Sequence, residues 1–455
     1  MKEFKILSPT AILGYGFPES SFLRGIAEKP DLIAVDGGSV DPGPYYLGSG
    51  KAFTNRVGVK RDLRYMLKAG VELGVPVVVG TAGGSGAKAH LDWCRDIVLE
   101  IAAEEKLDFK LGLIYADVAP ELIKQAIRDK KTEALADLAP LSETDVDQAA
   151  AVVAQMGTER IIAALDAGCR VILAGRAYDP SCFSSLPIKL GYDPALATHL
   201  GKILECAAIA ADPGSGADSV LGILKDDAFI LKPLSDARRF TSTSVAAHSL
   251  YEKSDPYSLP GPGGSIDLRQ VSFTEIGGGM VEVKGTRFVP TEGYKIKLEG
   301  VRSVGFRTVS MAGTRDPIMI GQIEEILKKV QESVDANLAN EGLTGKISFH
   351  LYGKNAVMGA LEPDAPAAPQ ELGILMEAVA PTQSEADTIC SIVRSSLLHY
   401  GYPGRIATAG NLAFPFSPSD IQAGEVFEFH IYHLMEVEDE SLFPLETMDV
   451  KGASA

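Results

Sequence analysis

The chain has 455 residues, of which 46% are hydrophobic and 23% charged, and its 43 basic and 60 acidic residues give a net charge of −17. This length predicts two or three domains rather than a single core. A negative field of this size repels phosphate backbones and anionic bilayers, so we expect no nucleic acid and no membrane partner, whereas a small anionic substrate is compatible with it.

The first half of the chain alternates short apolar runs with helical patterns. Continuous apolar strands that alternate with helices predict a mostly parallel sheet covered on both faces. We expect this α/β domain to cover residues 1–225 and to carry the chemistry. Its predicted strands are 9–13, 31–35, 75–79, 111–115 and 170–174, and its predicted helices are 19–28, 60–74, 86–105, 119–129, 144–167 and 195–211.

The pattern of predicted strands and helices changes twice in the remaining sequence. Residues 226–300 combine short strands with turn-rich stretches, which predicts a β-rich connector packed on the first domain. Residues 301–455 follow the order β-α-β-β-α-β, typical of a ferredoxin-like α+β domain. The predicted connector strands are 229–231, 271–273 and 280–283, and the later segments are strand 304–311, helix 316–340, strands 346–352 and 372–379, helix 383–400 and strand 426–434.

Glycine-rich polar turns follow most apolar runs of the first domain. Parallel strands bring their carboxyl ends to one edge of the sheet, and open α/β folds bind ligands at that edge. We therefore expect these turns to converge on one cleft. They cover residues 13–16, 35–39, 79–86, 114–117 and 173–179.

The turn at residues 80–86 is the strongest candidate for holding an anion. Glycines let successive backbone N–H groups converge, and the following helix points its positive end at the turn. A phosphate, a carboxylate or a thioester carbonyl would fit, with Gly83, Gly84, Ser85 and His90 as binding residues. The alternative is a tight strand-to-helix turn with nothing bound.

Two carboxylates, Asp36 and Asp41, lie in the next candidate loop with Ser39, and Ser49 follows. Carboxylates at close range can hold a divalent cation such as Mg²⁺ or Ca²⁺, or divide the roles of general acid and base. The alternative is a turn in which the aspartates cap backbone N–H groups. Arg61, at the predicted start of a helix, is placed to face the same cleft.

Two further aspartates, Asp117 and Asp179, follow predicted strands, with Arg176 close to the second. An arginine so placed can grip a substrate carboxylate with two parallel hydrogen bonds. The alternative is an internal Arg–Asp pair that only fixes the loop.

Several familiar sites have no support in the sequence. Its five cysteines are scattered, and the sequence contains no Gly-x-Ser-x-Gly, Cys-x-x-Cys or His-Glu-x-x-His pattern. No apolar run approaches the ~18 residues of a membrane span. We therefore expect a protein of the reducing cytoplasm.

A set of short segments occurs in one order over most of residues 10–320, namely 14–17, 80–84, 175–179, 204–206, 232–233, 250–256, 305–308 and 313–317. In these segments the chain resembles the acyclic terpene utilisation protein A family. The last third resembles the C-terminal extension of one branch of that family. Alanines stand at 207 and 208, where the family usually has glycines.

The resemblance implies catabolism of branched acyclic acids or their CoA thioesters. We expect a hydratase or dehydratase whose acid/base groups are among Asp36, Asp41, Asp117 and Asp179, with Arg176 holding the substrate. We also expect a homo-oligomer, with a small second subunit as a further option. The alternative is a non-catalytic ligand-binding or assembly subunit that docks through the last domain.

Overall fold

A computed structural model describes residues 3–251, 253–364, 369–406, 411–438 and 442–452. The chain forms two compact units, Met1–Arg302 with Phe429–Ala455, and Ser303–Glu428. The sequence analysis placed residues 429–455 in the last domain. They belong to the first unit, because the end of strand β18 (Asp420–Val437) pairs with β5 (Thr132–Ala134) and β19 (Leu445–Val450) pairs with β4 (Phe109–Ile114).

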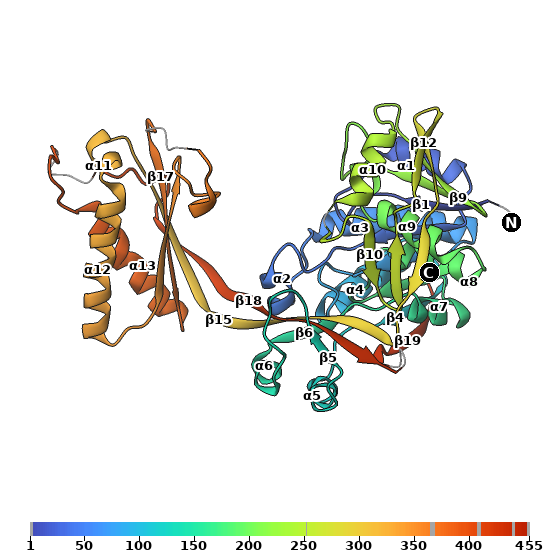
Figure 1. Ribbon diagram of the computed structural model, residues 1–455, viewed down its shortest axis with the longest axis horizontal. Helices are drawn as coiled ribbons and strands as arrows, with labels where there is room; N and C mark the ends of the chain where they lie inside the picture. The colour runs from blue at the N-terminus through green and yellow to red at the C-terminus, as the bar shows by residue number, and fades with distance from the viewer. Residues whose placement is uncertain (1–2, 252, 365–368, 407–410, 439–441, 453–455) are drawn as a thin grey trace. The chain divides into compact units, whose positions relative to one another are not determined.

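A ten-stranded sheet forms the centre of the first unit (Figure 1), in the order β12-β13-β9-β8-β1-β2-β3-β7-β4-β19. The five strands β1, β2, β3, β7 and β4 are parallel, which confirms the predicted parallel sheet, and the flanking strands are antiparallel. Their apolar runs are buried on both faces, as parallel strands require. The strands not yet bounded are β1 (Phe4–Ser8), β2 (Leu32–Asp36), β3 (Val77–Gly80), β7 (Val171–Ala174), β8 (Val220–Leu224), β9 (Ala228–Pro233), β12 (Ser272–Gly277) and β13 (Met280–Lys284).

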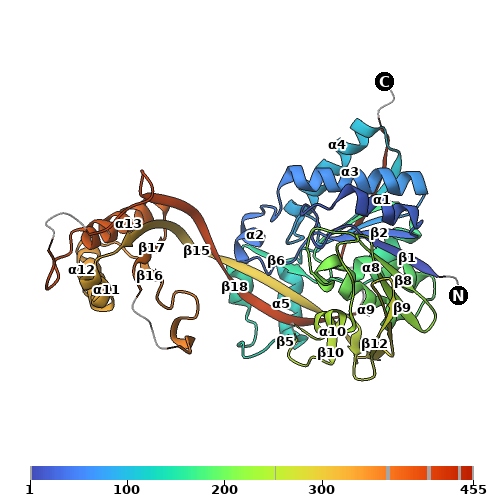
Figure 2. The same ribbon diagram turned by 90° about the horizontal axis from the view of Figure 1, so that it is seen from above.

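Helices cover both faces of this sheet (Figure 2). The apolar faces of α1, α3 and α4 pack on one side, and those of α7, α8 and α9 pack on the other. The helices of the first unit are α1 (Glu19–Ala27), α2 (Pro44–Ser49), α3 (Arg56–Leu73), α4 (Lys88–Glu105), α5 (Pro120–Arg128), α6 (Glu143–Gln148), α7 (Glu159–Asp166), α8 (Ser181–Lys189), α9 (Pro194–Leu204), the short η1 (Ala207–Ala210) and α10 (Ser242–Leu250).

Three predicted segments were wrong. The first strand lies at 4–8 rather than 9–13, where Pro9 offers no N–H for the ladder. The predicted helix 144–167 is instead α6, strand β6 (Ala151–Ala154) and α7, because β6 pairs with β15 (Tyr294–Thr314). The predicted helix 195–211 ends at Leu204, and η1 follows.

The predicted β-rich connector, residues 226–300, belongs to the first unit. Strands β9, β13 and β12 extend the central sheet. A small sheet of β10 (Ser258–Gly261), β11 (Gly264–Asp267) and β14 (Arg287–Pro290) completes the segment. Val281 and Val283 of β13 are buried in the same hydrophobic cluster as residues of the parallel strands, so this part of the segment shares their core.

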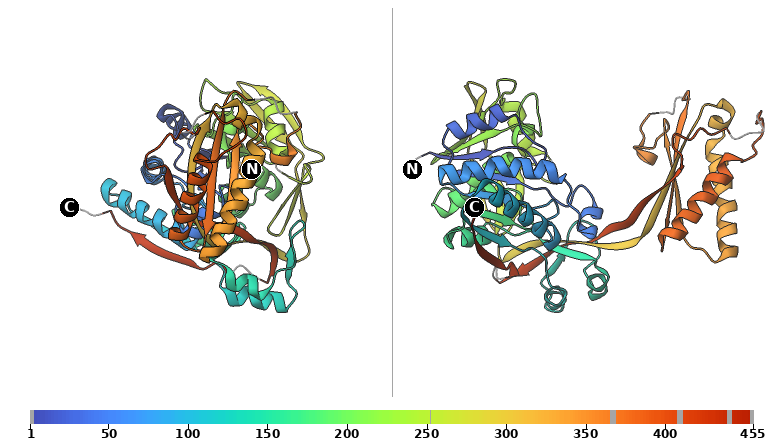
Figure 3. Two further views of the ribbon diagram at one scale, coloured as in Figure 1. Left: turned by 90° about the vertical axis from the view of Figure 1, so that its left-hand side faces the viewer. Right: turned by 180° about the vertical axis from the view of Figure 1, so that it is seen from behind.

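The second unit, Ser303–Glu428, has one antiparallel core. β15 pairs with β17 (Leu372–Ala380), and β17 pairs with β16 (Lys346–Tyr352), in the strand order β16-β17-β15-β18. The helices α12 (Ile323–Glu341) and α13 (Gln383–Leu398) lie side by side on the buried face of β17 (Figure 3). The short α11 (Pro317–Gly321) and η2 (Gly359–Leu361) complete the unit. Over the described residues, no helix is long and apolar enough to cross a membrane.

Candidate functional site

Three carboxylates meet at the carboxyl edge of the parallel strands. Asp36 is the last residue of β2, Asp179 lies in the loop after β7, and Glu205 follows α9. Each offers a carboxylate oxygen, and these oxygens lie within 4.8 Å of one another. The structure thus brings two of the predicted aspartates together, and it adds a glutamate that the sequence analysis did not select.

Asp36 is the most deeply buried of the three, with 5% of its surface exposed. Its Oδ1 atom has no hydrogen-bond partner among the described residues, while the Gly38 backbone N–H donates to the carboxylate. Burial raises the pKa of Asp36 well above its ordinary value, and the nearby charges of Asp179 and Glu205 raise it further. The environment of Asp36 therefore favours its protonated form.

The pKa of Asp179 is shifted in the opposite direction, below its ordinary value. Burial by itself would raise its pKa, but the cations of Arg176 and Lys202 outweigh burial and lower it. Arg176 Nη1 donates to Asp179 Oδ1 at 3.3 Å. With 24% of its side chain exposed, Asp179 is also reached from solvent. Two neighbouring carboxyl groups with divergent pKa values are the arrangement that acid and base chemistry needs.

The guanidinium group of Arg176 already donates hydrogen bonds to neighbouring groups of the protein. Its Nε donates to Glu299 Oε2 at 2.6 Å and its Nη1 donates to the carbonyl of Ala177 at 2.9 Å, in addition to the contact with Asp179. The prediction that Arg176 grips a substrate carboxylate is therefore not supported. The geometry matches the alternative of an internal pair, which positions Asp179.

The cluster alternates in charge. Lys202 Nζ lies 2.5 Å from Glu205 Oε1 and 3.8 Å from Asp179 Oδ2, and Lys297 Nζ lies 2.8 Å from Glu299 Oε1. The cations Arg176, Lys202 and Lys297 thus face four carboxylates, Asp36 included. One proton on Asp36 makes the cluster neutral, which lowers the cost of burying it.

A divalent cation at this cluster would be held by a different set of residues from the predicted pair, Asp36 and Asp41. Asp41 is exposed, and its Oδ2 accepts from Ser39 Oγ at 2.8 Å, so it caps its own turn. The oxygens of Asp36, Asp179 and Glu205 are close enough to share one ion. The ammonium of Lys202 already neutralises one side of this group.

The turn at residues 80–86 is buried throughout and serves packing. A Cβ on Gly83 would lie 2.5 Å from the His90 carbonyl oxygen, and one on Gly84 would lie 3.0 Å from Phe53. The amides of Thr81 and Ala82 donate to carbonyls of the loop after β7 and of β7 itself. Glycine is required here because the backbones touch, and the anion-binding role of this turn stays a prediction. Ser85 Oγ is buried without a partner among the described residues.

His90 and Ser49 stabilise the neighbouring loop. His90 Nε2 lies 3.0 Å from the carbonyl oxygens of both Tyr46 and Lys51, so this nitrogen carries the hydrogen. Burial lowers the pKa of His90, which keeps the ring neutral. The Lys51 amide donates to Ser49 Oγ at 3.4 Å. These contacts give both residues a local structural role.

Asp117 and Arg61 also act locally. Asp117 Oδ2 accepts from the Lys88 backbone N–H at 2.7 Å, which caps the first turn of α4. Arg61 donates to Asp62 Oδ1, and Asp62 accepts from the amides of Gly14 and Gly16. The Gly14–Gly16 turn is therefore held by Asp62 rather than opened toward a ligand.

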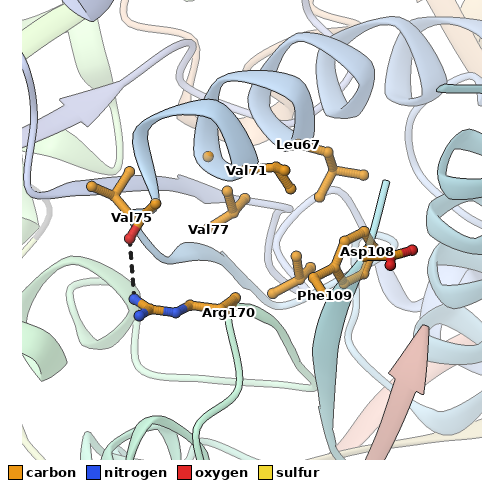
Figure 4. Close-up of a pocket in the computed structure, with 10 residues that line it drawn as sticks. Leu67, Val71, Val75, Val77, Asp108, Phe109 and Arg170 are labelled. Carbon is orange, nitrogen blue, oxygen red and sulfur yellow. Dashed lines mark hydrogen bonds between the residues drawn. The ribbon is translucent and has the colours of Figure 1, made fainter. Parts of the chain in front are cut away.

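Two cavities lie at opposite ends of these strands. A pocket of about 100 Å³ lies at the amino ends of β3 and β7 (Figure 4), where Arg170 Nη1 donates to the Gly74 carbonyl. Amino ends are not where α/β folds place their chemistry. A larger cavity, of about 280 Å³, is lined by Tyr178 and Ser181, which flank Asp179 in the chain.

The sequence analysis missed Lys202, Glu205, Lys297 and Glu299. Glu205 lies in the segment 204–206, which carried part of the family resemblance, so one signal for it was present. Lys297 and Glu299 lie two positions apart on one strand and therefore share a face. A pair of opposite charges on the buried face of a strand indicates an internal partner.

The comparisons with known proteins give one match. The model of the family described as Acyclic terpene utilisation family protein AtuA matches residues 53–416. Neither the curated proteins nor the solved structures contain a match. The matched segment contains Asp179, Glu205, Arg176 and Glu299, and begins after Asp36.

Proposed function

The chain belongs to the acyclic terpene utilisation family, whose name denotes a catabolic role, and from this premise we propose that it is a hydro-lyase. Its substrate is a short or branched carboxylate or dicarboxylate, or the corresponding CoA thioester. The observation that carries the proposal is geometric: carboxyl oxygens of the buried Asp36 and of Asp179 lie within 4.8 Å of each other. Burial raises the pKa of Asp36, and the neighbouring cations lower the pKa of Asp179, so the two groups suit the roles of acid and base.

In this proposal, Asp179 acts as the base and Asp36 as the acid of the dehydration. The Asp179 carboxylate removes the proton next to the carbonyl, and the electron pair of that C–H bond forms the C=C bond. The C–O bond at the next carbon breaks, Asp36 protonates the departing hydroxyl, and water leaves. Hydration is the reverse. Arg176 and Lys202 act as positioning residues, because their charges hold Asp179 ionised.

Deuterium exchange separates the two roles. Wild-type protein and two variants are mixed with hydroxyacyl thioesters and free hydroxy acids in D₂O, and NMR follows both exchange of the α-hydrogen and loss of water. Asp179→Asn should slow both by about 100-fold or more. Asp36→Asn should slow the loss of water and retain exchange.

The control for this experiment is Asp41→Asn, which removes an exposed carboxylate outside the cluster and should leave both rates unchanged. Full activity in folded Asp36→Asn and Asp179→Asn would overturn the proposal. Circular dichroism of each variant establishes that it has folded.

The second unit is the proposed assembly domain. We infer a ferredoxin-like fold from its order of strands and helices and from the strand order β16-β17-β15-β18. Its surface carries exposed apolar side chains, Val357 and Leu361 among them. The predicted homo-oligomer is tested by light scattering on the full chain, and a monomer at all concentrations would contradict it.

A further inference from the structure

Strand β16 forms an edge of the sheet in the second unit and is open on one side. It pairs with β17 along seven residues in one register, and among the described residues no other strand pairs with it. An edge strand directs the backbone N–H and C=O groups of alternate residues away from its sheet, where another strand can bind them. The partner that fits this edge is therefore a β-strand.

Features that normally prevent such pairing are missing from β16. The strand contains no proline and no register shift, and its one lysine, Lys346, is its first residue. The strands that end the other sheets differ in this respect. β12 has a register shift, β19 carries two acidic residues, β5 is three residues long, and β10 and β14 each contain a proline.

Two apolar side chains at this edge are incompletely covered. Ile347 and Phe349 pack against the core of the second unit but remain partly exposed. Their register partners on β17, Ala378 and Met376, are fully buried on the same face of the sheet. A further strand alongside β16 would cover the two side chains and remove apolar surface from water.

The residue pattern of β16 matches a second copy of the same strand. An antiparallel pair centred on Phe349 uses all seven residues of each strand. On the face that packs against the helices, Phe349 then faces its own copy, and Ile347 faces Leu351. Apolar side chains therefore meet apolar side chains across the pair, which is the favourable arrangement.

The polar side chains are compatible with the same pairing. On the other face of the strand, Ser348 faces His350, and Lys346 faces Tyr352. The two copies of Lys346 lie at opposite ends of the pair, about 20 Å apart for a rise of about 3.4 Å per residue. Lysine therefore never faces lysine, and each ammonium lies next to an aromatic ring, which attracts it.

We propose that β16 pairs antiparallel with β16 of a second copy of this chain, so that the two sheets join into one. This contact occupies the open edge of both copies, and the assembly therefore closes as a dimer. The proposal rests on the assembly role proposed above for the second unit and deepens it, because it names the contact surface. It does not depend on the hydro-lyase assignment.

Light scattering coupled to size-exclusion chromatography of the full chain locates the contact. Wild type should have the mass of two chains. A variant that combines Ser348→Lys and His350→Lys places lysine opposite lysine across the pair, so it should have the mass of one chain at the same concentration. Within one chain both lysines lie close to Glu377, which pairs in register with Ser348 and contacts His350. The variant should therefore fold, which circular dichroism checks.

A charge swap separates loss of the contact from a defect in the unit itself. Ser348→Glu combined with His350→Glu should also have the mass of one chain, because glutamates then face each other. An equimolar mixture of the lysine and glutamate variants should recover the mass of two chains, since opposite charges now meet. Mixing would not repair a damaged fold.

Met311→Lys is the matched control, because Met311 is 41% exposed on the inner strand β15 rather than at the edge. This variant should remain a dimer. A dimer that persists in the folded lysine variant would overturn the inference and leave the assembly role, and loss of the dimer in Met311→Lys alone would place the contact on the face of the sheet. A wild type that is monomeric at every concentration would remove both, whereas the hydro-lyase proposal is decided by turnover alone.

Discussion

Arg176 and Glu299 form a buried ion pair in which Nε lies 2.6 Å from Oε2 and the side chains are 3% and 1% exposed. The pair ties the loop after β7 to strand β15. A pair this deep contributes less to net stability than its short distance suggests, because both charges lose their hydration. Its main consequence is geometric, since it fixes the arginine that contacts Asp179.

Removing one partner of this pair should be costly. Glu299→Ala leaves the Arg176 guanidinium buried with fewer negative neighbours, so we expect a loss of about 3–5 kcal/mol in the free energy of unfolding. Urea denaturation followed by circular dichroism measures it. Glu133→Gln breaks the exposed contact with Lys295 and, as the control, should cost less than about 1 kcal/mol. Equal costs for the two variants would contradict the buried-pair assignment.

Asp36 makes stability depend on pH in a direction opposite to that of a salt-bridged carboxylate. Its raised pKa means that the folded protein binds a proton that the unfolded chain releases above the ordinary value of 3.8. The contribution of this group is therefore favourable at low pH and is lost as pH rises through the folded pKa. Asp36→Asn, which cannot ionise, should be more stable than wild type at neutral pH.

The measurement for Asp36 is chemical denaturation of wild type and Asp36→Asn across the acid and neutral range. Their difference in unfolding free energy should grow with pH from about 3.8 upward and stop growing above the folded pKa. Titrating groups far from Asp36 are shared and cancel in the difference, whereas Asp179 and Glu205 interact with Asp36 and contribute to the difference with it. A difference that is constant with pH would show that Asp36 is ionised in the folded state.

Helices and strands were predictable where a local run of apolar residues determines the type of element. The strands ending at Asp36 and Ala174 and the helices around them follow from local apolar runs. β6 was not predictable, because its pairing with β15 joins residues almost 150 positions apart, beyond any local pattern. The short apolar run at 151–154 fits a helix equally well until its partner is known.

The site was predictable only in part, for a related reason. Asp36 ends β2 and Asp179 follows β7, two parallel strands with β3 between them, so topology alone places both residues at one edge of the sheet. Glu299 contacts Arg176 although the two residues lie far apart in the sequence, and no local spacing predicts this contact. Asp117 also follows a strand of the same sheet, but its carboxylate accepts from the Lys88 backbone N–H and so caps the adjacent helix.

That capping contact gives a prediction that separates structure from chemistry. Asp117→Ala removes the acceptor for the Lys88 amide at the start of α4 and should cost about 1 kcal/mol of unfolding free energy. Turnover should be unchanged once the protein is folded. Asp117→Asn keeps an acceptor and should recover most of the stability. A loss of turnover in Asp117→Asn without a loss of stability would return Asp117 to the catalytic residues.

Chelation tests whether a proton or a metal ion balances the carboxylates. The cations Arg176, Lys202 and Lys297 leave one negative charge of the cluster uncompensated, and a proton on Asp36 removes it. A divalent cation would instead need Asp36 ionised and would lie close to the Lys202 ammonium, which repels it.

We therefore expect dialysis against EDTA to leave turnover and the melting temperature unchanged, and addition of Mg²⁺ or Mn²⁺ to shift neither. Asp179→Asn, treated in the same way, controls for ions bound elsewhere on this acidic protein. Activity lost on chelation and restored by one of these ions would make Asp36, Asp179 and Glu205 its ligands. Asp36 would then lose its part as proton donor, because a carboxylate bound to the ion cannot also carry the proton.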